Sequence, residues 1–106
     1  MNFDKKLKNL RELASMSQAE LAKAVGVSTV MISQYENGKK MPGRETVIRI
    51  AEVFGISSSD LLGDNIEGEQ YDEIIILNRA AKKMTPENRK KLLEMAKVMF
   101  KEDFED

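Results

Sequence analysis

Residues 17–38 read SQAELAKAVGVSTVMISQYENG, and their spacing predicts two short helices joined by a tight turn. Ser17, with Glu20 three residues later, forms a capping box that marks the start of the first helix. Gly26 ends this helix, because a residue without a Cβ adopts the left-handed conformation at low cost. Ser28 is a good N-cap for the second helix. Two helices connected so closely cross at a steep angle, which is the helix-turn-helix geometry.

Three further helices are predicted around this pair. One spans residues 3–14, one begins near Arg44 and ends at Gly55, and a short one follows the second capping box at Ser57. Apolar residues at helical spacing on the five helices are expected to form one core: Leu10, Leu21, Ala22, Val25, Ile32, Val47, Ile50, Ala51, Phe54 and Leu61. About 60 residues can fold alone, but only with marginal stability.

The lysines near the start of the chain are interpreted mostly as a solvated surface. Lys5, Lys6 and Lys8 lie away from the apolar stripe of residues 3–14, where a charged side chain is most often in water. A lysine near a DNA groove can also contact phosphate.

The remainder of the chain predicts a linker and two amphipathic helices. Residues 64–70, DNIEGEQ, are polar and acidic, as in a linker. Residues 71–83 carry an apolar stripe at helical spacing, and Thr85 before Pro86 starts a last helix that runs to about residue 101. We therefore expect domains at 1–63 and 71–106, with a final acidic tail that frays.

The composition excludes several classes of function. The chain has 106 residues, of which 42% are hydrophobic and 33% are charged, as in an ordinary globular protein. It has no cysteine and no histidine, which excludes disulfides, zinc sites and histidine general bases. No apolar run approaches the roughly 20 residues that span a bilayer, and the N-terminus lacks the apolar core of a signal peptide. We expect a cytoplasmic protein without metal, cofactor or membrane contact.

The charge is distributed unevenly along the chain. The net charge is −1, but residues 1–62 carry 9 Lys and Arg against 7 Asp and Glu, whereas residues 63–106 carry 8 against 11. The positive excess thus coincides with the helix-turn-helix pair, although it is small. Any attraction for DNA must come from local clusters of basic residues.

Many positions of the first three-fifths of the chain resemble one known family. The matching residues occur at fixed spacing in residues 18–22, 26–28, 32–33 and 35–38. They resemble Cro/C1-type, or XRE-like, helix-turn-helix transcriptional regulators such as phage repressors. The resemblance implies an all-α fold, with a five-helix lambda-repressor-like DNA-binding domain followed here by two C-terminal amphipathic helices.

The resemblance also implies roles for individual residues. Arg11 matches an arginine that pairs with the glutamate at the end of the recognition helix, here Glu36, and the alternative is an exposed arginine without a fixed partner. Gln18 matches a residue that contacts phosphate at the start of a helix. The positions that match the base-reading residues of the family, with a solvent-facing or packing role as the alternative, are Thr29, Val30, Ser33 and Gln34. The residues after the recognition helix that are expected to hold the DNA backbone are Asn37, Lys39, Lys40 and Arg44.

The two C-terminal helices expose apolar side chains that need a partner. The residues expected to form a homodimer interface are Ile74, Leu77, Leu92, Leu93, Ala96, Met99 and Phe100. The alternative is that both helices fold back on their own chain.

The sequence therefore predicts a DNA-binding transcriptional regulator, most simply a dimeric repressor that reads a palindrome in double-stranded DNA. Alternatives are an antitoxin or a protein–protein adaptor that binds a partner protein through the C-terminal helices. An enzyme is not expected, because nucleophile, base and orienting group do not occur together.

Overall fold

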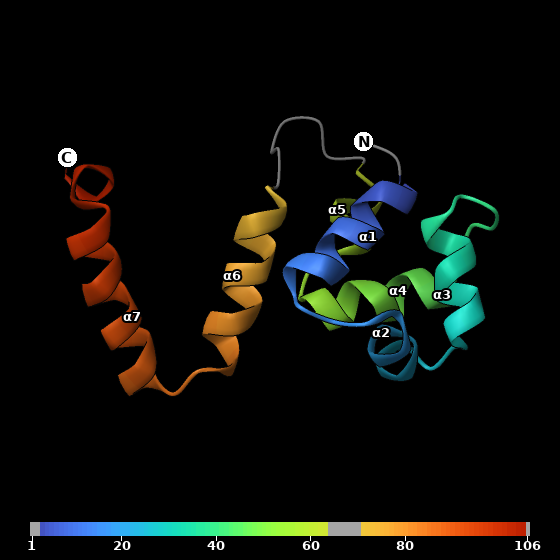
Figure 1. The fold of residues 1–106 in the computed structure, drawn as a ribbon, viewed down its shortest axis with the longest axis horizontal. Coiled ribbons are helices and arrows are strands. Elements are labelled where there is room, and N and C mark those ends of the chain that lie inside the picture. Colours follow the sequence, from blue (N-terminus) through green and yellow to red (C-terminus); the bar gives the residue numbers. More distant parts are fainter. Residues whose placement is uncertain (1–2, 64–70, 106) are drawn as a thin grey trace.

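The computed structural model describes residues 3–63 and 71–105, and their regular structure is helical (Figure 1). The elements in chain order are α1 (Phe3–Leu13), α2 (Gln18–Val25), α3 (Thr29–Glu36), α4 (Arg44–Phe54), α5 (Ser58–Leu62), α6 (Asp72–Lys83), α7 (Pro86–Met99) and the 3-10 turn η1 (Lys101–Phe104). The predicted all-α fold, with five helices followed by two, is confirmed. The tail is more ordered than expected, because η1 forms where a frayed end was predicted.

Local hydrogen bonds define the ends of α2 and α3 as the sequence indicates. The Ser17 side chain accepts from the Glu20 backbone N–H at 3.0 Å, and Glu20 Oε1 accepts from the Ser17 N–H at 2.9 Å. These bonds from Ser17 lower the pKa of the Glu20 carboxyl group, so Glu20 stays ionised at the positive end of α2. Gly26 ends α2 at a φ of 86°, and Ser28 caps α3. The predicted turn is therefore correct in its details.

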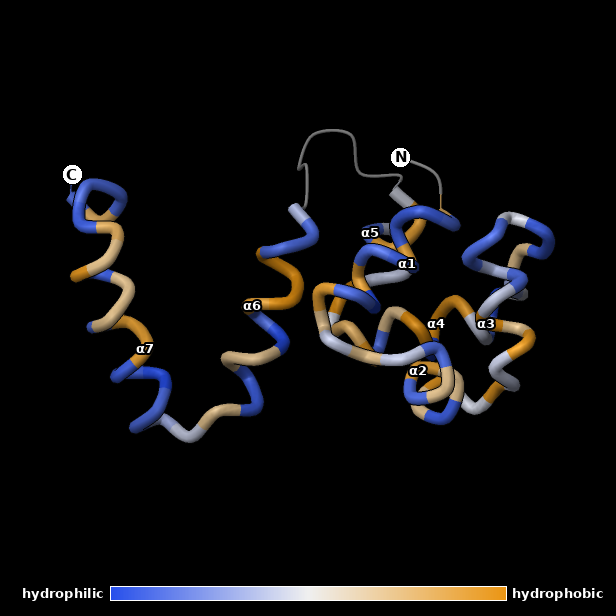
Figure 2. The backbone as a smooth tube through the Cα atoms, viewed as in Figure 1, coloured by the Kyte–Doolittle hydropathy of each residue, from blue (hydrophilic) through white to orange (hydrophobic). Residues whose placement is uncertain are grey.

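The first five helices enclose one hydrophobic core. All ten predicted core residues are buried, and Leu7 and Tyr35 join them. α2 and α3 pack on each other, and contacts of α3 with α1 and of α2 with α4 hold the pair against the other helices. In Figure 2 hydrophobic and hydrophilic residues alternate along the helices, as expected where one side of each helix faces a core. The recognition helix α3 thus stands on a packed support.

α6 belongs to this body rather than to a detached segment. It packs against α1 and α4, and Ile75 is part of the same core. Asp72, at the first position of α6, accepts a hydrogen bond from Lys6 at 3.1 Å and one from Asn9 at 2.7 Å. The interpretation of Lys6 as a solvated lysine is wrong, because Lys6 is buried between α1 and α6, where it forms an ion pair with Asp72.

α7 stands apart from the five-helix body (Figure 1). It follows α6 after a short turn and lies at the end of the molecule opposite to α3. None of its residues is buried. Of the two C-terminal helices, α6 thus folds back on its own chain, on α1 and α4, whereas α7 does not. The predicted linker, residues 64–70, lies outside the described part of the chain.

Candidate nucleic-acid interface

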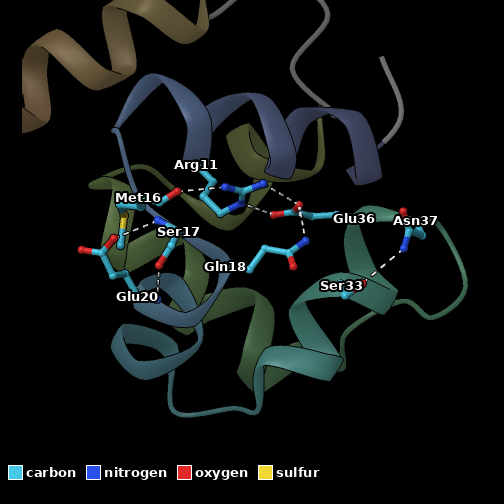
Figure 3. Close-up of polar contacts among 8 residues, drawn as sticks. All are labelled: Arg11, Met16, Ser17, Gln18, Glu20, Ser33, Glu36 and Asn37. Atoms are coloured by element: carbon cyan, nitrogen blue, oxygen red, sulfur yellow. Dashed lines mark hydrogen bonds and ion pairs between the residues drawn. The ribbon is translucent and has the colours of Figure 1, made fainter.

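Glu36, in the last turn of α3, is the centre of a polar network that fixes the recognition helix (Figure 3). Its carboxylate accepts from Arg11 Nε at 2.6 Å, from Arg11 Nη2 at 3.0 Å and from Gln18 Nε2 at 3.1 Å. Arg11 also donates from Nη1 to the Met16 carbonyl oxygen at 2.8 Å. The network therefore joins α1, the α1–α2 connection and α2 to the end of α3.

The Arg11–Glu36 pair is shielded from water. The Glu36 side chain is 2% exposed and that of Arg11 is 12% exposed. The hydrogen bond with Glu36 raises the pKa of the Arg11 guanidinium against the lowering effect of burial, so Arg11 keeps its charge although it is largely shielded from water. Paired hydrogen bonds between a planar guanidinium and a carboxylate restrict their relative orientation. The pair thus holds α3 at a defined angle to α1.

The four predicted base-reading residues all occur on α3 and none belongs to its buried face. Thr29 and Val30 are exposed, with Val30 66% accessible, and Ser33 and Gln34 are half-buried. Ile32 and Tyr35 point into the core instead. A surface with a hydroxyl, an amide and apolar groups matches the mixture of polar atoms and thymine methyl groups in a major groove.

The residues predicted to contact phosphate fall into two groups. Lys39, Lys40 and Arg44 are exposed in the loop after α3 and at the start of α4. The backbone N–H groups of Lys39 and Lys40 donate to the Gln34 carbonyl oxygen at 2.9 and 3.3 Å, so this loop folds back on the end of α3. Cationic side chains on a loop whose backbone is held by hydrogen bonds are well suited to contact the phosphates of the DNA backbone.

The other two residues of that set are already engaged within the protein. Gln18 donates one amide hydrogen to Glu36, which orients its side chain beside α3. Asn37 is exposed, and its side chain donates to Ser33 Oγ at 3.3 Å. The sequence indicated neither contact, although both residues remain accessible at the surface. Each has amide groups left with which to bind phosphate.

The residues assigned to a dimer interface occupy the outer sides of α6 and α7. Ile74 and Leu77 are exposed on α6, on the side opposite to Ile75. The exposed members on α7 and at its end are Leu92, Leu93, Met99 and Phe100, while Ala96 is half-buried. The structure thus leaves this apolar surface uncovered within one chain.

Sequence reasoning missed the contacts that attach α6. Besides Asp72 and Ile75, Arg79 Nε donates to the Val53 carbonyl oxygen of α4 at 3.0 Å. Asp72, Ile75 and Arg79 follow one another at helical spacing, so they form one face. That periodicity is visible in the sequence, but the stronger apolar stripe at Ile74 and Leu77 obscured it.

No helix within the described residues has the length and hydropathy that crossing a membrane requires. Among the same residues, acidic side chains do not gather into groups of three or more that could hold a metal ion.

Comparison with known proteins gives the same family as the geometry. A helix-turn-helix family model matches residues 7–61. The cryptic phage CTXphi transcriptional repressor RstR of Vibrio cholerae is 28% identical over 74% of this chain and 70% of its own. Antitoxin PezA of Streptococcus pneumoniae is 34% identical over 58% of this chain, which spans only 39% of PezA.

Two solved structures share the fold over 93% of this chain. A transcriptional regulator from Listeria innocua matches with a TM-score of 0.58 at 20% identity, over 95% of its length. The SINR protein, solved in complex with SINI protein, matches with a TM-score of 0.56 at 19% identity, over 98% of its length. The family model covers more than half of the present chain and confirms the resemblance seen in residues 17–38. This chain therefore belongs to the helix-turn-helix family.

Proposed function

We propose that this protein is a sequence-specific DNA-binding transcriptional repressor, which binds a palindromic operator as a homodimer in the cytoplasm. The observation that carries the proposal is the network at Glu36, because it ties the end of α3 to α1 and α2 while leaving the outer residues of α3 accessible. A recognition helix must be presented in a fixed orientation before it can discriminate between bases. Its role is binding rather than catalysis.

The outer side of α3 would read the operator in the major groove. Gln34 can bond to the N6 and N7 atoms of an adenine through its amide, and Val30 can contact a thymine methyl group. Thr29 and Ser33 can donate to or accept from several bases. Contacts from Gln18, Asn37 and the basic loop to phosphate would set the position of α3 along the groove.

The homodimer would be formed by the uncovered apolar residues of α6 and α7. Large exposed apolar patches on a soluble protein are typical of protein interfaces. A two-fold dimer presents two recognition helices to the same side of the duplex, about 34 Å apart, as half-sites one turn apart require. Residues 1–63 would then supply the DNA-binding unit, and residues 71–106 the contacts between copies.

A regulatory partner protein is the second candidate for that surface. The similarity to the antitoxin PezA and to the fold of SINR, which was solved in complex with SINI protein, favours this possibility. The similarity to PezA covers only a minor part of the antitoxin, whereas RstR matches this chain over most of both lengths. We therefore favour a repressor whose α7 surface binds a second copy.

The test is selection of bound sites from random double-stranded DNA by the purified full-length protein. We expect enrichment of an inverted repeat, and a binding constant that falls steeply with salt as counterions are released. Enrichment of single half-sites would contradict the dimer. Absence of any enriched sequence, or binding that does not respond to salt, would contradict sequence-specific DNA binding as a whole.

A further inference from the structure

The two sides of α6 face different structures. Asp72, Ile75 and Arg79 lie on the side that packs against α1 and α4. Ile74 and Leu77, 46% and 60% exposed, lie on the opposite side. If a second copy covers Ile74 and Leu77, α6 becomes the layer between the dimer interface and the DNA-binding body. The position of α6 on α1 would then determine where each recognition helix lies relative to the two-fold axis.

The contact that defines this position is a polar cluster of Asp72, Lys6 and Asn9, here called the Asp72 cluster. Asp72 Oδ1 accepts from Lys6 Nζ at 3.1 Å, and Asp72 Oδ2 accepts from Asn9 Nδ2 at 2.7 Å. Lys6 and Asp72 are each 7% exposed. Both oxygens of the carboxylate are therefore engaged by two residues one turn apart on α1, and a shift of α6 along α1 would break both bonds.

Apolar packing alone does not define a position in this way. The contact of Ile75 with the core would tolerate a small displacement, because dispersion and hydrophobic contacts have no direction. A buried charge that loses its partner is unfavourable, so a buried ion pair can select one register among several similar packings. Asp72 also lies in the first turn of α6, where the helix dipole stabilises a negative charge.

The path from the dimer surface to the recognition helix is continuous. The Asp72 cluster joins α6 to α1, and the Arg11–Glu36 pair joins α1 to α3. At the other end of α6, Arg89 of α7 donates to the Ala81 carbonyl oxygen at 3.2 Å and to that of Met84 at 2.5 Å, which ties the turn between α6 and α7. Polar contacts of fixed direction thus occur at each joint between α7 and α3.

We infer that the Asp72 cluster sets the spacing between the two DNA half-sites that the dimer accepts. This inference rests on the proposed function, because it needs a dimer that binds paired half-sites. Lys6, Asn9 and Asp72 act as positioning residues: they touch no base, and they determine which operators are bound by fixing the separation of the two α3 helices.

The first experiment measures binding of the full-length protein to two selected half-sites separated by spacers of different length. For the wild type, changing the spacer by half a turn should weaken binding by about 10²-fold, because both domains can no longer engage at once. The double variant Lys6→Met/Asp72→Ala leaves no unpaired buried charge. In this variant the same change of spacer should weaken binding by less than about tenfold. The sequence preferred within each half-site should stay the same.

The matched control is Lys5→Met/Glu73→Ala, which makes the same changes of charge at exposed neighbouring positions on α1 and α6. It should keep the spacing preference of the wild type. Thermal melting and sedimentation verify that each variant is folded and dimeric. If the double variant does not fold, Asn9→Ala, which removes one bond at a half-buried residue, should broaden the spacing preference more weakly.

A second readout needs no DNA. The chain has no cysteine, so Val30→Cys places a single spin label on the exposed side of α3 in each copy. The distance between the two labels should show a narrow distribution in the otherwise wild-type dimer and a broad one with Lys6→Met/Asp72→Ala. Equally narrow distributions, or an unchanged spacing preference, would overturn the inference. The lack of any dipolar coupling in the wild type would instead show that the two α3 helices do not lie near each other in a dimer, which contradicts the proposed function.

Discussion

Arg11 and Glu36 meet through two parallel hydrogen bonds, from Nε at 2.6 Å and from Nη2 at 3.0 Å, although they are 25 positions apart in the chain. The pair lies at the point where α1 crosses the end of α3, and Gln18 binds the same carboxylate. Arg11 of α1 and Gln18 of α2 together satisfy the buried charge of Glu36. The orientation of the recognition helix therefore depends on a charge interaction as well as on the core.

The first prediction concerns the stability of this pair. Arg11→Met should lower the free energy of unfolding by about 3 kcal/mol, because it leaves Glu36 buried without its cation. Arg11→Met together with Glu36→Leu should cost less than the single change, since no charge is then left unpaired. Urea unfolding of the wild type, both single variants and the double variant gives the coupling energy. Strictly additive effects would show that the two residues do not depend on each other.

Much of the α1–α5 domain could be predicted because its signals are local. The capping box at Ser17, the N-cap Ser28 and the C-cap Gly26 determine helix ends within a few residues. The spacing of apolar residues on the short helices identifies the core. The Asp72 cluster could not be predicted in the same way, because Lys6 and Asp72 are 66 residues apart. A lysine off the apolar stripe is exposed in most proteins, and only packing of α6 on α1 changes that expectation.

The base-reading and phosphate-contacting roles of the candidate residues remain predictions, but the structure adds to them. The sequence indicates that Thr29, Val30, Ser33 and Gln34 lie away from Ile32, and the accessible surface agrees with that placement. It gave no indication that Gln18 is held by Glu36. Such a contact depends on the crossing of α2 and α3, which periodicity does not define.

The second prediction is that Gln34 reads a base. Gln34→Ala should weaken binding to the selected operator by about 1–3 kcal/mol and relax the preference at one base pair, because a bidentate contact is lost. Binding to random DNA should stay the same. Fluorescence anisotropy with the operator and with its single-base variants measures both effects.

Ser59→Ala is the control for this change, because Ser59 is an exposed polar residue of α5, outside the helix-turn-helix pair. It should bind as the wild type does. If Gln34→Ala loses equal affinity for the operator and for random DNA, Gln34 contacts only the DNA backbone.

The third prediction concerns the basic loop. Removal of Lys39, Lys40 or Arg44 should weaken binding to all sequences alike, because a phosphate contact carries no sequence information. Each loss should reduce the slope of log K against log salt by about one unit, as one fewer counterion is released. Titrations of the operator at several salt concentrations measure this slope for each alanine variant and for the triple variant.

A matched triple variant, Lys90→Ala/Lys97→Ala/Lys101→Ala, removes the same charge from exposed residues of α7 and η1, far from α3 (Figure 1). Its salt slope should stay close to that of the wild type. A slope that falls equally in the two triple variants would indicate a general effect of net charge and would remove the loop from the interface.

The last prediction tests the α7 surface in the full-length chain. Leu93, 46% exposed, belongs to the predicted interface, whereas Val98, 82% exposed, lies on the opposite side of α7. Burial of a leucine at a dimer interface contributes about 1.5–3 kcal/mol, and a buried glutamate without a partner would be unfavourable in addition. Leu93→Glu should therefore shift the protein from dimer to monomer at micromolar concentration, and Val98→Glu should not.

Sedimentation equilibrium of the two variants measures that shift, and thermal melting shows whether the monomer is folded. The core of the monomer should remain intact, because Leu93 is not buried in one chain and the buried core is built from residues of the first six helices. The monomer should retain the half-site preference of the wild type with much weaker binding to the full palindrome, because it lacks the second domain that engages the other half-site.

A wild type that is already monomeric, or a Leu93→Glu variant that still dimerises, would contradict the assignment of this surface to a second copy. The surface would instead belong to a regulatory protein if a monomeric wild type binds that protein and the Leu93→Glu variant does not.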